Sequence, residues 1–214
     1  MRSARHDVHC IRGAIDGYAT GIVHLIGAAY GRDTVQHAWR EFMSADETFH
    51  GHGPNAGLFF SWLFHQWSPT PEKGNTVIDH TLYGVPPTRA YLQRSSHRIN
   101  PLLRQYLEAC LATSPGFYEV VTNKPHVGFK LRDVLTGVEC EVLEALASVS
   151  LGRGDILFAH LVSMDEMTLM DAISPLSLPA TLKQRLIQLC SRRCLPEQVG
   201  PELRKVYFSL LGMH

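Results

Sequence analysis

The hydrophobic period of this chain changes twice, near residues 116 and 179, and these changes limit the folds open to it. In the first half, apolar residues recur at the spacing of amphipathic helices. From Phe117 onward, short runs of β-branched and aromatic residues alternate with turn residues, which is typical of strands. After Pro179 the helical spacing returns. We therefore predict an α+β fold with a helical N-terminal half, a small antiparallel β-barrel-like module and C-terminal helices.

The predicted organisation has three parts. The helical region covers 1–115, the barrel-like module covers 116–175, and the C-terminal helices at 176–214 pack back on the body. A chain of 214 residues is long enough for one domain with a real core, or for two small domains that share an interface.

Start and stop signals place the helices. Thr34 and Thr88 are predicted helix caps, and Asn100-Pro101 combines an N-cap with proline at the first helical position. Pro69 and Pro71 end the most apolar segment, which we expect to be a buried helix. The predicted helices are Val8–Ala29, Val35–Ser44, Gly57–Trp67, Thr76–Tyr83, Thr88–His97, a helix from Pro101 to Leu111, Ala180–Cys194 and Pro201–Leu211.

The strands follow from alternation and from continuous apolar runs. They are predicted at Phe117–Val121, Val127–Val134, Val138–Leu143, Ile156–Val162 and Met167–Met170. We expect the second of these to end in a turn at Gly137 and the fourth to follow a tight turn at Gly152-Arg-Gly-Asp155, since glycine readily adopts positive φ. Short strands this close together suggest a small, strongly curved barrel or sheet.

Charge and cysteine content narrow the function classes. Lysine plus arginine equals aspartate plus glutamate at 20 each, which argues against a generic DNA-coating protein but leaves room for a local basic patch. The five cysteines are widely spaced and give no disulfide framework, so a reducing compartment fits best. No secretory signal or convincing membrane span is evident. We expect a cytoplasmic protein without a membrane partner.

Basic residues on consecutive helical segments form the main candidate binding surface. Tyrosines at positions 91 and 106 are interleaved with them, as in some nucleic-acid surfaces. The alternative to a binding surface is that the helical arginines lie on a solvated helix face. For Arg132, which lies in a predicted strand, the alternative is a structural ion pair at the sheet rim. The candidate binding residues are Arg89, Arg94, Arg98, Arg104 and Arg132.

The best metal candidate is a loop that carries Glu47, His50 and His52. Two imidazoles and a carboxylate can hold a divalent ion, but the spacing is generic. We find no catalytic triad, nucleotide-binding loop or nucleophile elbow in the spacing of the residues. We therefore expect no cofactor, and a metal only in the alternative hypothesis of a hydrolase that uses this loop.

Three glycines, Gly13, Gly17 and Gly21, recur at a spacing of four within the first predicted helix. Each costs about 1 kcal/mol relative to alanine in a helix interior, so either a close backbone approach compensates for them or the helix is marginal and the start of the chain is disordered. That approach is either packing inside the chain or a homodimer contact through this helix face.

The middle of the chain resembles a bacterial family of uncharacterised proteins that usually carry a SEC-C motif, a short zinc-binding segment. The resemblance spans roughly residues 38–179. It rests on the order of Phe60-Ser-Trp62-Leu-Phe64, Ala90-Tyr-Leu92, Leu102-Leu103, Tyr106-Leu107, Phe117-Tyr-Glu-Val120, Leu131-Arg-Asp-Val-Leu-Thr-Gly137, Ala147-Ser148 and Gly154-Asp-Ile-Leu-Phe-Ala159.

The zinc module of that family is absent from this chain. A SEC-C motif needs Cys-x-Cys and a later Cys with His or Cys, because zinc takes four ligands in a tetrahedron. This chain has no Cys-x-Cys, and Cys190 with Cys194 cannot replace it. The function that we predict is therefore a non-enzymatic binding or adaptor protein, with protein or RNA as the partner.

Overall fold

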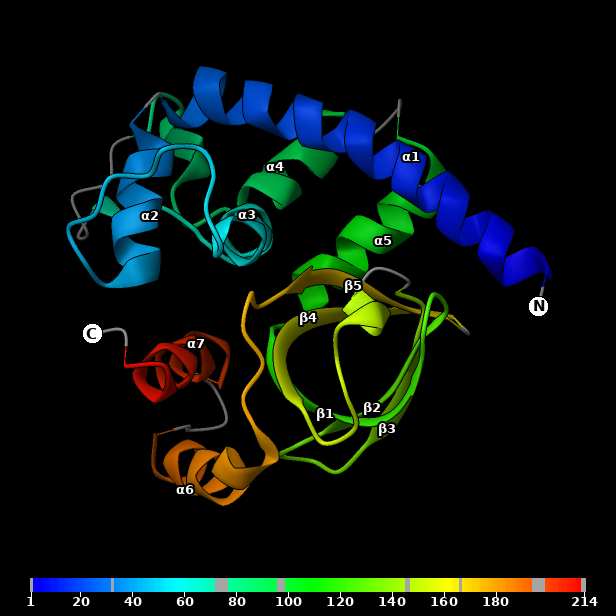
Figure 1. Ribbon diagram of the computed structural model, residues 1–214. Coiled ribbons are helices and arrows are strands. Elements are labelled where there is room, and N and C mark those ends of the chain that lie inside the picture. Colours follow the sequence, from blue (N-terminus) through cyan, green and yellow to red (C-terminus); the bar gives the residue numbers. More distant parts are fainter. Residues whose placement is uncertain are drawn as a thin grey trace. The chain divides into compact units, whose positions relative to one another are not determined.

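The chain divides into two compact units, Met1–Ala112 and Thr113–His214. The structure is a computed structural model that describes residues 2–31, 33–71, 77–95, 99–144, 147–165, 167–193 and 199–212. Side chains are described for these residues except 2–9, 192–193 and 199–201. The first unit is helical, and the second holds the strands together with the C-terminal helices (Figure 1).

The helical unit is organised around one long helix, α1. Figure 1 shows α4 and α5 running beneath α1, and both of them contact it. Five residues at the end of α1 form a π-helical turn, η1. The elements are α1 (Arg2–Leu25), η1 (Ile26–Tyr30), α2 (Thr34–Met43), α3 (Ala56–His65), the 3₁₀ turn η3 (His80–Leu82), α4 (Pro87–Arg94) and α5 (Pro101–Ala112).

Aromatic side chains from α2, α3 and the loop between them fill part of the core of this unit. Trp39 meets Phe59 edge to face at 4.9 Å and Phe49 at 4.6 Å. Phe42 packs on both Phe59 and Trp62. Such offset and edge contacts are the favoured aromatic geometries, and they explain why the most apolar segment of the sequence folds as a buried helix.

Both predicted threonine caps are wrong. Thr34 is the first residue of α2, but it is buried and its hydroxyl donates to the Tyr30 carbonyl at 2.8 Å. Thr88 lies one residue inside α4, because Pro87 already occupies the first helical position. The Asn100 prediction is confirmed: its side-chain oxygen accepts from the Leu102 backbone N–H at 2.8 Å.

Five strands of the second unit close into a barrel in the order β1-β2-β3-β5-β4. Neighbouring strands are antiparallel except β3 and β5, which pair in parallel through Val142 and Thr168. This order and these directions are those of an OB-type barrel, a small Greek-key barrel. The strands are β1 (Gly116–Lys124), β2 (Gly128–Asp133), β3 (Glu139–Val142), β4 (Ile156–Met164) and β5 (Met167–Ile173).

The interior of the barrel is filled by one apolar cluster from β1 to β5. Val120, Leu131 and Ala159 are fully buried there, and Phe129 and Val142 pack with them. The ladder is tight at the start of β2: a β-carbon on Gly128 would overlap the Val142 carbonyl oxygen. Only glycine fits this approach between β2 and β3.

The C-terminal helices pack on the outside of the barrel. The segment after β5 contains a 3₁₀ turn, η5 (Ala180–Leu182), followed by α6 (Lys183–Arg193) and α7 (Val199–Leu210), which contact each other (Figure 1). Tyr207 of α7 stacks on Phe158 of β4 with ring centroids 5.2 Å apart, and its hydroxyl donates to the Leu176 carbonyl at 3.1 Å. Strand β4 is therefore buried on both faces, as its continuous apolar run predicts.

The predicted α+β class is confirmed, with helices before and after a small barrel. The parallel β3–β5 pair makes the barrel mixed rather than wholly antiparallel. Among the described residues of the predicted helix at 76–83, only His80–Leu82 are helical. The first compact unit ends at Ala112, and the second holds the barrel and the C-terminal helices. The division into three parts stays a prediction. None of the described helices combines the length and apolar character that a membrane span requires.

Candidate functional site

A groove of about 500 Å³ lies between α4 and α5 of the helical unit. Its lining combines two guanidinium groups, a carboxylate and apolar side chains. Residues at helical spacings of three, four and seven share a face, which is why each helix presents several of its residues to the groove. α4 contributes Arg89, Leu92 and Gln93, and α5 contributes Arg104, Glu108 and Leu111.

The two arginines of the groove differ in their electrostatic surroundings. Arg104 lies 3.7 Å from Glu108, one turn further along α5. Arg89 is exposed, and no ion pair or hydrogen bond of its side chain is found within the part of the chain that the structure describes. Arginine offers five donors in a planar fork that matches carboxylate and phosphate groups. The groove thus presents one uncommitted guanidinium next to a second one that a neighbouring carboxylate partly neutralises.

A buried chain of hydrogen bonds fixes the helix that carries Arg89. The hydroxyl groups of Tyr18 on α1 and Thr88 on α4 are hydrogen-bonded, and the Thr88 hydroxyl also meets Nδ1 of His65 on α3 at 2.9 Å. All three side chains are buried. Because buried polar groups are costly to leave unpaired, these hydrogen bonds hold α1, α3 and α4 in one register directly behind Arg89.

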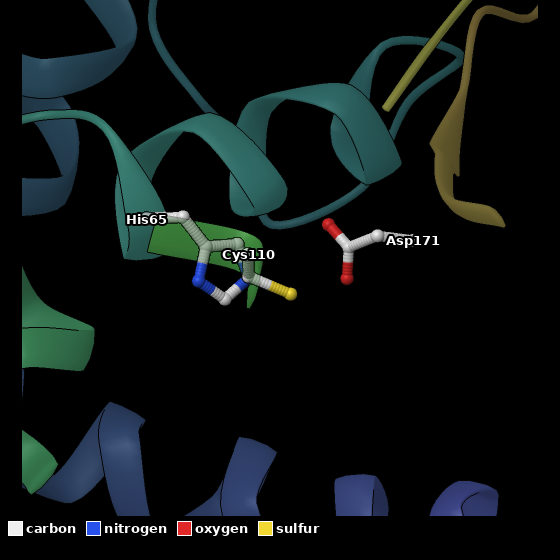
Figure 2. A group of neighbouring side chains, drawn as sticks. All are labelled: His65, Cys110 and Asp171. Atoms are coloured by element: carbon white, nitrogen blue, oxygen red, sulfur yellow. The ribbon is translucent and has the colours of Figure 1, made fainter. Parts of the chain in front are cut away.

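His65 also lies close to the thiol of Cys110 on α5 (Figure 2). A ring nitrogen of His65 and the sulfur of Cys110 are within 4.8 Å of each other. No third His, Cys, Asp or Glu among the described residues of the helical unit brings a ligand atom into this range. The pair alone does not supply the ligand set of a structural zinc site.

Two other predicted binding arginines have different fates. Arg94, at the end of α4, forms an ion pair with Asp79. Hydrogen bonds from the side chain and backbone of Thr81, and then from Arg94, hold the pKa of the Asp79 carboxyl below its ordinary value. Arg94 is therefore a structural cation of the η3 turn. Arg98 lies outside the described residues.

Arg132 of the barrel belongs to a cross-strand ion-pair cluster. It contacts Glu139 on β3 at 2.6 Å and Glu119 on β1 at 3.6 Å. The hydrogen bond to Glu139 raises the pKa of the Arg132 guanidinium. Lys130 and Lys183 pair with the same two carboxylates at 2.7 Å. These cations of the barrel surface are already matched, so the OB-type topology alone does not establish a nucleic-acid site.

The predicted metal loop does not form a ligand cluster. Glu47, His50 and His52 are all exposed, and their ligand atoms are not gathered within coordinating range of one another. Nδ1 of His52 instead contacts the His50 carbonyl at 3.0 Å, and the Glu47 carbonyl accepts from Gln36. The backbone of the loop is hydrogen-bonded to the Gln36 side chain of α2 and to the His52 ring.

The glycines of α1 do not act together. A β-carbon on Gly21 would lie 2.9 Å from the Tyr91 ring, so Gly21 allows close packing of α1 on α4. Gly13 and Gly17 are exposed and have open space at the same position. Packing inside the chain thus explains Gly21, whereas the homodimer contact through Gly13 and Gly17 stays a prediction.

Two histidines within apolar segments are a sequence signal for buried polar groups. His65 ends the most apolar helix, and His160 interrupts the apolar run of β4. A histidine in such a run must find partners when it is buried. His65 is hydrogen-bonded to Thr88 of α4. His160 is hydrogen-bonded to Thr113, in the segment before β1, and to Asp171 of β5.

Comparisons with protein-family models, with curated proteins and with solved structures find no match to this chain. The resemblance to SEC-C proteins therefore stays a prediction.

Proposed function

We propose that this chain is a binding protein whose α4–α5 groove holds an acidic, partly apolar segment of a partner protein. The observation that carries the proposal is the uncommitted guanidinium of Arg89, which lies with Arg104 in a groove between two fixed helices. Charge complementarity favours a negatively charged partner at this position.

The lining favours a protein over RNA as the occupant. Leu92 and Leu111 offer apolar surface, which suits the side chains of a peptide. None of the described residues that line the groove is aromatic, so they offer no ring on which a base could stack. The Glu108 carboxylate would also repel a phosphate backbone. An acidic peptide can place one carboxylate on Arg89 and avoid Glu108.

Fluorescence anisotropy with labelled synthetic probes tests this proposal. The probes are a short peptide of alternating glutamate and leucine, the same peptide with glutamine in place of glutamate, and a mixed-sequence single-stranded RNA. We expect the acidic peptide to bind and Arg89→Ala to weaken it at least about tenfold, because a charge-assisted hydrogen bond contributes more than about 1.4 kcal/mol.

Arg185→Ala is the matched control, since Arg185 is also an exposed arginine on a helix but lies outside the groove. It should leave peptide binding unchanged. Equal binding by the wild type and Arg89→Ala would contradict the assignment of the groove. Binding of the RNA without binding of the acidic peptide would contradict the choice of a protein partner.

A further inference from the structure

A second series of hydrogen-bonded polar groups lies in the barrel unit and has no role in the groove. The Thr113 hydroxyl is 2.9 Å from Nε2 of His160, and Nδ1 of His160 is 3.1 Å from a carboxylate oxygen of Asp171. A hydroxyl, an imidazole and a carboxylate are thus joined in line through the two ring nitrogens. This is the arrangement of nucleophile, base and orienting acid that recurs on unrelated folds.

The strands hold the imidazole in this position. His160 lies on β4 opposite Ala172 of β5, and the register shifts immediately after it, between His160 and Leu161. Such a bulge re-aims the side chains next to it. Asp171, which is also labelled in Figure 2, precedes Ala172 and is mostly buried, with 11% of its side chain exposed. The carboxylate therefore acts on a ring that the sheet already fixes.

The residue that carries the hydroxyl is less buried than the one that carries the imidazole. His160 is fully buried, whereas Thr113 is partly exposed and lies in the irregular segment between α5 and β1. The neighbouring residues Ala112 and Ser114 are exposed. An electrophile would have to approach from the side of Thr113, since His160 is buried.

We infer that the Thr113 hydroxyl is an acyl-accepting nucleophile. Its oxygen attacks the carbonyl carbon of the donor, a new ester bond forms, and the bond from that carbon to the leaving group breaks. Nε2 of His160 takes the hydroxyl proton, and Asp171 stabilises the resulting imidazolium and holds the ring in its orientation.

The burial of His160 defines the class of donor. A fully buried imidazolium is not placed to protonate a departing group that lies in solvent, so the leaving group must depart as an anion. Aryl esters and thioesters meet this condition, because phenolates and thiolates are stable anions. Water can later hydrolyse the acyl-threonine: the acyl group leaves as a carboxylic acid, which ionises, and the threonine hydroxyl is restored. The proton that His160 took in the first step is also released to solvent.

The test uses 4-nitrophenyl acetate with the full chain. We expect 4-nitrophenolate release and a mass increase of one acetyl group, which peptide mapping locates at Thr113. Thr113→Val keeps the shape of the side chain, removes the hydroxyl and should lose both signals, while Thr113→Ser should keep them. A Thr113→Val variant with unchanged circular dichroism shows that the loss is not due to unfolding.

Ser163 and Thr168 provide an internal control in the same two strands. Their hydroxyls are hydrogen-bonded to each other at 3.0 Å, and no histidine among the residues that the structure describes is hydrogen-bonded to either of them. They should remain unacetylated. No adduct on the wild type, or equal nitrophenolate release by the wild type and Thr113→Val, would overturn the inference and leave the chain a purely structural hydrogen-bond network.

Discussion

Gly128→Ala should destabilise the barrel more than any conservative glycine substitution elsewhere in the sheet. The added methyl would overlap the Val142 carbonyl oxygen and lie 3.1 Å from the carbonyl carbon and 3.2 Å from the Glu144 nitrogen. All three neighbours are backbone atoms, so no side chain can rotate away. The β2–β3 ladder must move apart at its Phe129–Val142 pair.

The magnitude has two parts. Forcing a methyl group into a packed site costs about 1–3 kcal/mol. The backbone at Gly128 has φ of +155°, a value that side chains with a β-carbon rarely adopt, which adds about 1 kcal/mol or more. We expect a loss of about 3 kcal/mol in the free energy of unfolding of the barrel.

Gly137→Ala separates the two parts. Gly137 ends the next turn of the same sheet with φ of +76° but has nothing within 4 Å of the β-carbon position, so only the backbone strain of about 1 kcal/mol remains. Hydrogen–deuterium exchange of the β2 and β3 amides in each variant gives the local free energies of opening. The steric argument is refuted when Gly128→Ala costs no more than Gly137→Ala.

Three further outcomes follow from particular contacts and can be measured by urea denaturation. Gly17→Ala should stabilise the helical unit by about 0.5–1 kcal/mol, because its β-carbon meets only open space. Gly21→Ala should stabilise it less or destabilise it, because its β-carbon would crowd the Tyr91 ring. Equal effects of the two substitutions would contradict this difference. Tyr30→Phe should cost about 1 kcal/mol, since it removes the 2.9 Å hydrogen bond to the Val85 carbonyl, and an unchanged midpoint would contradict it. Burial raises the pKa of Tyr118 above its ordinary value. The stability that the neutral phenol contributes to the folded state is therefore complete below about pH 10 and is lost as the pH rises further. Tyr118→Phe should reduce this alkaline loss of stability, and an identical alkaline profile would show that Tyr118 does not cause it.

Local signals in the sequence were sufficient for most of the secondary structure. The Asn100-Pro101 start, the aromatic helix and the strand runs depend on neighbours within a few residues, and the structure confirms them. The parallel β3–β5 closure depends on one pairing, Val142 with Thr168, across a long connection. Nothing in either short segment specifies that partner, so the mixed character of the barrel could not be predicted.

In the candidate site, too, the sequence does not predict which side chains pair with each other. Arg89 and Arg94 lie on one short helix and look equivalent in the sequence. Only the fold reveals that Asp79 neutralises Arg94, whereas Arg89 faces the groove. Local sequence favours Thr88 as a helix cap, because its hydrogen-bonding partner Tyr18 is 70 residues away and only the fold brings the two together. The residue types of the groove were predictable, but their pairing was not.

The aromatic core of the helical unit has a consequence for spectroscopy. All three tryptophans of the chain, at positions 39, 62 and 67, belong to that unit, and the barrel unit has none. Selective excitation of indole therefore reports on one half of the molecule alone, while the barrel carries only tyrosine and phenylalanine. Unfolding of the helical unit and the reaction at Thr113 can be followed in the same unlabelled sample, the first as a change in indole emission and the second as the colour of the released phenolate.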